Sequence, residues 1–213
     1  MKSETANQSA GMARMAYQKF SLQMVVERFA LKTVTSQTLF DDVTPCPPSP
    51  LLSETFNETI PLGLAIGTEK ARSELIVMPL LVEIRRILKH QISVFSGIEF
   101  NVEPSVGLKG ICDFLVSKSD EQYIVRSPVI AVVEAKKGEI EGGLGQCAAE
   151  MVAVQKFNDQ HQTPVDRVAG IVTTGSSWKF LLLHSQTLTI QADETSIEHV
   201  DRILGMFVKL LTA

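Results

Sequence analysis

The segment GLKGICDFLVSK at residues 107–118 places one carboxylate, Asp113, inside a pattern that otherwise predicts a buried β-strand. Strand side chains alternate between the two faces of a sheet, so we expect Asp113 on the same side as Ile111 and Leu115. A buried carboxylate has to be paired with a cation, coordinated to a metal ion or neutralised. Asp113 should therefore have a partner elsewhere in the chain.

A second acid and a lysine occur in SPVIAVVEAKK at residues 127–137. The continuous apolar run from Val129 to Val133 is typical of a central strand that is buried on both faces. Glu134 and Lys136 are two residues apart, so both side chains project from the same face of this strand. If the two strands adjoin, Asp113 and Glu134 converge beside one ammonium group.

Two converging carboxylates need more compensation than a single lysine provides. Unit charges about 5 Å apart repel by roughly 3 kcal/mol at an effective dielectric constant near 20, and Lys136 would offset only part of this. Mg²⁺ and Mn²⁺ prefer carboxylate, carbonyl and water oxygens as ligands. The residues therefore favour a divalent-cation site, and a structural ion pair at the end of the sheet is the alternative.

This pattern resembles the PD-(D/E)XK nuclease superfamily, which includes restriction endonucleases and junction resolvases. The resemblance covers about residues 69–185 and rests on GICD, on VVEAKK about twenty residues later, on the helical SELIVMPLLVE upstream and on GQCAAEM downstream. The segment GIVTTGSSWKFLLL is also similar to the strand pair that follows the motif helix in restriction-enzyme motor subunits. Cys112 stands where the name-giving proline would be, at a position that varies widely in the superfamily.

The resemblance implies an α/β fold of the restriction endonuclease-like type, with a mixed central β-sheet flanked by helices. It implies that Asp113 and Glu134 bind Mg²⁺ or Mn²⁺, with the backbone carbonyl of Ala135 as a further ligand. Glu74 would be an auxiliary acid and metal ligand on the upstream helix. A glutamate four residues after Lys70 also fits an ordinary i,i+4 ion pair, so both interpretations of Glu74 stay open.

The same resemblance implies a metal-dependent DNA endonuclease. Lys136 would orient or activate the attacking water, and Gln146 would assist from the next helix. A nuclease that cuts both strands would suit a two-fold homodimer. The alternative within this fold is a binding or interaction module that has no catalytic activity.

A dinucleotide-binding site is a less favoured alternative, suggested by GGLGQCAA. Gly143, Gly145 and Ala148 fit the G-x-G-x-x-G/A fingerprint. That fingerprint requires its first glycine immediately after a strand, whereas the six residues KGEIEG follow Lys136. Asp166 also precedes its strand instead of ending it.

The N-terminal third is expected to pack on the core. We expect residues 1–15 to be poorly ordered, because they are small and polar. FSLQMVVERFALKTV at 20–34 predicts an amphipathic helix of about three turns. The prolines of residues 41–67 indicate an irregular connection, so that residues 16–68 comprise one helix and one long loop.

Residues 69–213 carry the expected core. Apolar spacing predicts a helix over 69–89 that is bent or divided at Pro79. On this helix Glu74 falls on the side of Leu81, and Glu83 is turned towards solvent. The patterns that follow predict a hairpin, a central strand, a helix, three further strands and a last helix; their segments are 92–104, 107–118, 127–137, 143–158, 167–175, 178–185, 187–191 and 196–211.

Composition narrows the class of protein. The chain has 213 residues, which fits a single domain, and its net charge of −4 provides no overall basic surface for nucleic acid. Three widely spaced cysteines suit neither a disulfide framework nor a zinc site. No signal-peptide or membrane-length apolar run occurs, so we expect a cytoplasmic protein that does not contact a membrane.

Overall fold

The chain is built around one mixed sheet of eight strands, described in a computed structural model for residues 16–212. Neighbouring strands follow the order β1-β7-β6-β5-β4-β3-β2, and β8 pairs with β6. The pairs β1/β7 and β4/β5 are parallel and the others are antiparallel. The strands are β1 (Lys32–Ser36), β2 (Ser93–Glu99), β3 (Ile111–Ser117), β4 (Val129–Ala135), β5 (Val168–Thr173), β6 (Ser177–His184), β7 (Thr187–Gln191) and β8 (Thr195–Ser196).

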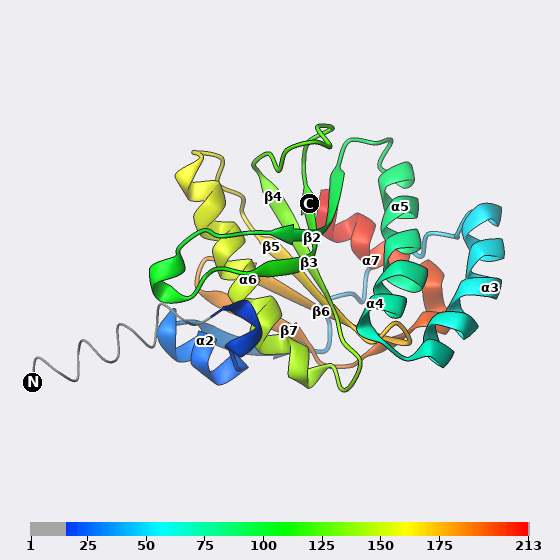
Figure 1. Ribbon diagram of the computed structural model, residues 1–213, viewed down its shortest axis with the longest axis horizontal. Coiled ribbons are helices and arrows are strands. Elements are labelled where there is room, and N and C mark those ends of the chain that lie inside the picture. Colours follow the sequence, from blue (N-terminus) through cyan, green and yellow to red (C-terminus); the bar gives the residue numbers. More distant parts are fainter. Residues whose placement is uncertain (1–15, 213) are drawn as a thin grey trace, which may run out of the picture.

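Helices cover both faces of this sheet (Figure 1). The α-helices are α2 (Leu22–Arg28), α3 (Pro50–Ile66), α4 (Glu69–Arg72), α5 (Met78–Ile87), α6 (Glu141–Gln160) and α7 (Val200–Thr212). The shorter turns are η1 (Tyr17–Lys19), η2 (Ser73–Val77), η3 (Pro104–Val106) and η4 (Ile197–His199), of which η2 is π-helical. The expected α/β architecture with a mixed sheet between helices is confirmed.

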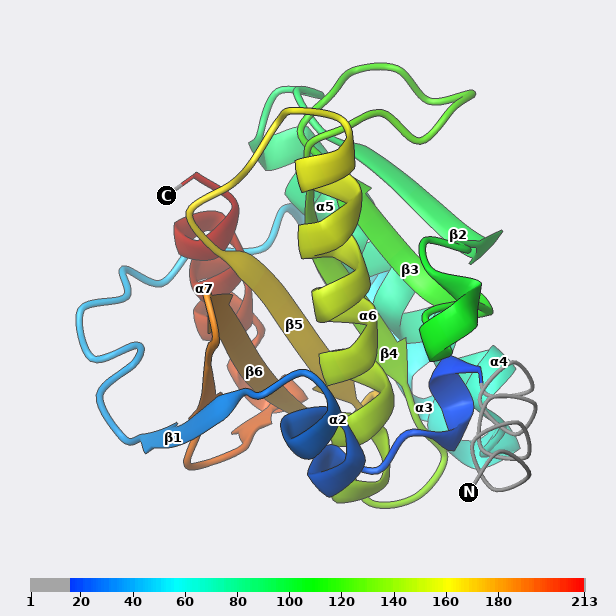
Figure 2. The same cartoon turned by 90° about the vertical axis from the view of Figure 1, so that its left-hand side faces the viewer.

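The two faces carry separate hydrophobic layers. On one face α6 runs across the sheet with α2 beside its first half (Figure 2), and Cys147, Met151 and Leu181 lie in this layer. On the other face α3, α5 and α7 pack together around Trp178 and Phe207. β4 is buried along its whole length between the layers, as its continuous apolar run predicted.

The N-terminal region contributes a strand to the sheet, which the sequence analysis did not expect. The predicted three-turn helix ends at Arg28, and Ala30 then adopts a positive φ of 51°. The chain leaves this bend as β1, which pairs in parallel with β7. Expected disorder at residues 1–15 falls outside the described residues.

A helix occupies most of the segment that was expected to be an irregular connection. Pro50 is the first residue of α3, a position where proline costs no hydrogen bond, and the preceding Ser49 caps the helix by accepting from Leu52 N. Pro61 lies inside the helix and is tolerated there. Packing of Leu52 and Phe56 against α5 outweighs the weak helix propensity of the prolines.

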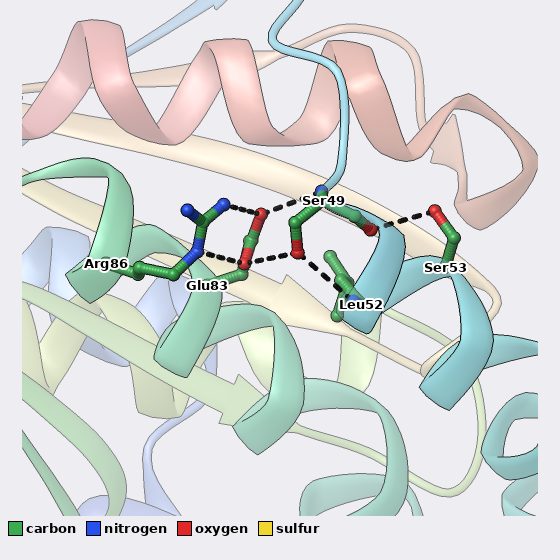
Figure 3. A network of polar contacts seen from close by, with 5 residues as sticks. All are labelled: Ser49, Leu52, Ser53, Glu83 and Arg86. Atoms are coloured by element: carbon green, nitrogen blue, oxygen red, sulfur yellow. Dashed lines mark hydrogen bonds and ion pairs between the residues drawn. The ribbon is translucent and has the colours of Figure 1, made fainter.

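The orientation predicted for Glu83 is wrong, because α3 covers the face of α5 that was expected to meet solvent. Glu83 is only 4% exposed and accepts hydrogen bonds from Ser49 N and Ser49 Oγ at 2.9 and 3.1 Å (Figure 3). Arg86 completes the network with bonds of 2.9 and 2.7 Å to the same carboxylate. The chain stays helical through Pro79, so the expected division is replaced by the π-helical turn η2 just before it. The wide turn of η2 shifts the phase of α5 relative to α4.

Within residues 16–212, no helix is both long enough and apolar enough to span a bilayer.

Candidate functional site

Asp113 lies where β3 and β4 separate. The paired register of these strands runs from Ser117 to Phe114 and stops opposite Val133. Beyond that point Asp113 Oδ2 accepts a hydrogen bond of 2.9 Å from the backbone N–H of Ala135. A side-chain oxygen therefore takes the place of the backbone acceptor that β3 no longer offers.

The regular alternation of β3 breaks at the same position. Cys112 and Leu115 belong to one core layer although they are three residues apart, whereas Phe114 belongs to the other. On the adjoining strand Gly97 has a positive φ of 62°, which glycine adopts without strain. The expectation that Asp113 follows a simple two-residue period is therefore wrong, and its carboxylate faces the gap between strands instead.

Glu134 and Lys136 meet on one face of β4, as their spacing predicted. Lys136 Nζ donates to Glu134 Oε1 at 2.5 Å, and the side chains are 17% and 2% exposed. Among the described residues, the second oxygen of Glu134, Oε2, is buried and has no hydrogen-bond partner. A buried carboxylate oxygen without a partner is costly, so this atom is suited to an additional ligand.

The electrostatics of this group favour a cation. Burial and the neighbouring Asp113 charge raise the pKa of Glu134 to about 8, against the opposing effect of Lys136. Burial also raises the pKa of Asp113, although the Ala135 N–H and Lys136 act in the opposite sense. Burial lowers the pKa of Lys136, but the charge of Glu134 and its hydrogen bond more than reverse this and leave it raised. Lys136 thus stays protonated without neutralising both acids.

Gln146 joins this group from α6, as expected, and brings with it an acid that the sequence analysis missed. Gln146 Oε1 accepts from Lys136 Nζ at 3.1 Å, and Gln146 Nε2 donates to Glu150 Oε1 at 3.1 Å. Glu150 is completely buried on the same helix. Its position four residues after Gln146 is the signal that could have identified it, because such residues are neighbours on a helix.

Glu74 lies near the site but is engaged elsewhere. It forms an ion pair of 2.9 Å with Lys70, and its side chain is 60% exposed. Glu74 and Asp113 both line a groove of about 330 Å³. The complete lining of this groove is Glu69, Lys70, Ser73, Glu74, Ser96, Gly97 and Asp113.

Glu69, at the start of α4, is an acid whose charge affects the pKa values of the site residues. Its charge raises the pKa of Asp113, Glu134 and Lys136, although other causes are larger. Glu69 Oε1 also accepts from Lys137 N at 3.3 Å. No residue pattern distinguished Glu69 from Glu74, because both lie in the same predicted helix.

A basic residue of α4 holds the end of β4 in place. Arg72 Nη1 donates to the backbone carbonyls of Lys136 and Lys137 at 3.0 and 2.7 Å. These bonds hold α4 against the end of β4, next to Glu134 and Lys136. The site is therefore assembled from β3, β4, α4 and α6.

The donor set fits a hard divalent cation only in part. No group of three or more His, Cys, Asp or Glu side chains in residues 16–212 is arranged as metal ligands. Asp113 and Glu134 each offer an oxygen beyond the bonds described above, and Glu134 Oε2 is an unpartnered buried atom. In a strand the N–H and C=O of one residue point to the same edge, so the Ala135 carbonyl faces the gap beside Asp113. Two carboxylates and a carbonyl suit Mg²⁺ or Mn²⁺, which keep several water ligands.

The glycines of the alternative dinucleotide fingerprint serve helix packing. Gly143 and Gly145 lie inside α6 and not in a turn after β4. A Cβ atom on Gly145 would lie 2.2 Å from the backbone oxygen of Phe20, and one on Gly143 would lie 2.6 Å from Val172 Cγ1. Gly143 and Gly145 are thus explained by close approach of α6 to its neighbours.

No protein-family model matches the chain, and no curated protein sequence shows significant similarity to it.

Proposed function

We propose that this protein is a metal-dependent nuclease that hydrolyses phosphodiester bonds of DNA, on a restriction endonuclease-like version of the mixed sheet. The observation that carries this proposal is that Asp113 and Glu134 interact where β3 and β4 separate, with Lys136 beside them. A structural role alone does not account for the buried Glu134 oxygen that lacks a partner.

Asp113, Glu134 and the carbonyl of Ala135 would hold Mg²⁺ or Mn²⁺. When bound, the cation supplies a water of lowered pKa and stabilises charge on the phosphate oxygens. The Ala135 N–H fixes one Asp113 oxygen, so the other oxygen is directed away from that bond. Glu74 and Glu69 line the adjoining groove, where they would hold further waters.

Lys136 acts on the reacting groups and not on the cation. A protonated lysine has three N–H donors and no lone pair for a metal. Two of its donors bond Glu134 and Gln146, which leaves one for the attacking water or a phosphate oxygen. As the new bond from water to phosphorus forms and the bond to the leaving oxygen breaks, this N–H stabilises the added negative charge.

Incubation of supercoiled plasmid DNA with purified protein tests the proposal. Nicked or linear DNA should form with Mg²⁺ or Mn²⁺ and not with EDTA, and D113N and E134Q should abolish the reaction. The control is D166N, which changes an exposed aspartate that pairs with Arg167 and His184 outside the site. Linear products formed without accumulation of nicked circles would support a two-fold dimer that cuts both strands.

Cleavage that persists in EDTA or in D113N would overturn the proposal. Binding of DNA without cleavage under any of these conditions would favour the inactive binding module instead.

A further inference from the structure

Glu150 is a buried ionisable residue that the proposed reaction does not use. It is completely buried in the layer between α6 and the sheet, near Cys112, Cys147 and Tyr17. Its Oε2 atom has no hydrogen-bond partner among the described residues. Burial and then the charge of Glu134 raise its pKa. An apolar side chain would occupy this position at lower cost, so the carboxyl group requires an explanation.

The hydrogen bond between Gln146 and Glu150 determines which end of the Gln146 amide faces Lys136. A glutamine amide has a donor end and an acceptor end, and its orientation follows from the bonding network. Glu150 Oε1 accepts from Gln146 Nε2 at 3.1 Å, which leaves Gln146 Oε1 to accept from Lys136 Nζ at 3.1 Å. Glu150 Oε1 can accept this bond in either protonation state, because a proton can reside on Oε2.

Without an acceptor at position 150 the Gln146 amide keeps one bond, the one from Lys136 Nζ, and can turn away from it more readily. The turned amide would present N–H groups to the Lys136 ammonium, and two donors cannot bond each other. Lys136 would then keep only its bond to Glu134, and its ammonium group would lose a fixed direction. Gln146 is only 4% exposed, so water does not readily replace the missing acceptor.

We infer that Glu150 is a positioning residue for Lys136 and that it acts by orienting the Gln146 amide. Its catalytic importance rests on the proposed function, whereas the contact relay from Glu150 through Gln146 to Lys136 does not. The relay fixes one Lys136 N–H donor and Glu134 fixes a second, and together they direct the third.

Chemical labelling of Lys136 tests the relay without any assay of activity. Competitive labelling with an amine-reactive reagent, in EDTA at one fixed pH, is read by mass spectrometry with exposed Lys89 as the internal reference. E150L and Q146L should each label Lys136 roughly five- to tenfold faster, as expected for loss of one hydrogen bond to a charged group. E150Q should label at the wild-type rate, because the glutamine oxygen still accepts from Gln146.

The double variant E150L/Q146L decides whether the two residues act in one pathway. If they do, it should label no faster than Q146L, because residues of one network are not additive. Unchanged labelling in E150L, additive effects in the double variant, or E150Q that behaves as E150L would each overturn the inference. E150M replaces E150L if the leucine variant does not fold, with the same expectation.

An assay of DNA cleavage provides a second measurement, which distinguishes failure of the proposed nuclease function from failure of the relay. E150L should lower kcat for DNA cleavage with little change in KM, and E150Q should retain it. A wild-type protein that does not cleave DNA would refute the proposed function, and the labelling results would still test the relay.

Discussion

At the scale of single residues, substitution of Lys136 tests whether this lysine stabilises charge in the proposed reaction or contributes to binding. K136M keeps most of the apolar stem and removes the ammonium group, so affinity for DNA should change by less than about tenfold. Single-turnover cleavage should fall by roughly 10²- to 10³-fold, as when one pre-organised contact to a transition state is deleted. Gel-shift titration and rapid-quench kinetics on the same preparation measure the two quantities.

K118M is the matched control for this change, because Lys118 follows β3 at the opposite end from Asp113. It should leave the cleavage rate as in the wild type. Equal cleavage rates in K136M and K118M would remove the catalytic role of Lys136 and favour a structural ion pair with Glu134.

At the scale of elements, Gly145 determines how closely the N-terminal region approaches α6. A Cβ atom there would lie 2.2 Å from the backbone oxygen of Phe20 and 2.6 Å from Leu22 N, so backbone would have to move. G145A should therefore lower the free energy of unfolding by about 3 kcal/mol. Urea denaturation followed by circular dichroism measures this change.

For Gly142, on the same helix, we expect substitution by alanine to change the free energy of unfolding in the opposite direction. Nothing lies within 4 Å of a Cβ atom built there, so G142A should stabilise the protein by up to about 1 kcal/mol through helix propensity. Similar stability of the two variants would contradict the close packing of α6 on the segment around Phe20.

The link between α3 and α5 predicts a pH-dependent stability. Hydrogen bonding to Arg86 lowers the pKa of Glu83 against the effect of burial, and Ser49 lowers it further. A carboxyl whose folded pKa is lowered stabilises the fold above its unfolded pKa of about 4.3. That contribution is lost as the pH falls through the lower folded value.

E83Q should therefore be less stable than the wild type by about 2 kcal/mol near neutral pH. The difference should shrink as the pH falls below about 4. E58Q, which changes an exposed glutamate of α3, is the control and should match the wild type throughout. A pH-independent difference would show that Glu83 acts through shape and not through charge.

The sequence predicted those elements whose buried residues follow a simple pattern, either continuous or alternating. Continuous apolar residues identified β4, and alternation with turn residues identified the hairpin of β2 and β3. α3 was missed because its prolines were given more weight than the Ser49 cap and the packing against α5. Glu83 was misplaced for the same reason, since its burial depends on α3.

At the scale of the whole molecule, what escaped prediction depends on contacts between distant segments. β1 pairs with β7 in the register Lys32 to Thr187, a contact that the sequence near Lys32 does not encode. Glu134 and Lys136 could be placed together from their spacing on one strand, whereas Asp113 and Gln146 were joined to them by the family resemblance. Glu69 could not be placed there, because its relevance arises only when α4 packs beside β4. Glu150 could have been identified only through Gln146, which lies four residues before it on α6.

We propose that Asp113 and Glu134 form one divalent-cation site at the point where β3 and β4 separate. Calorimetric titration of Mn²⁺ into the wild type, D113N and K136M tests it most directly. We predict one ion bound per wild-type chain, loss of that binding in D113N, and affinity in K136M within about tenfold of the wild type, because lysine does not ligate the metal. Absence of binding to the wild type, or equal binding to D113N, would contradict a cation site formed by Asp113 and Glu134.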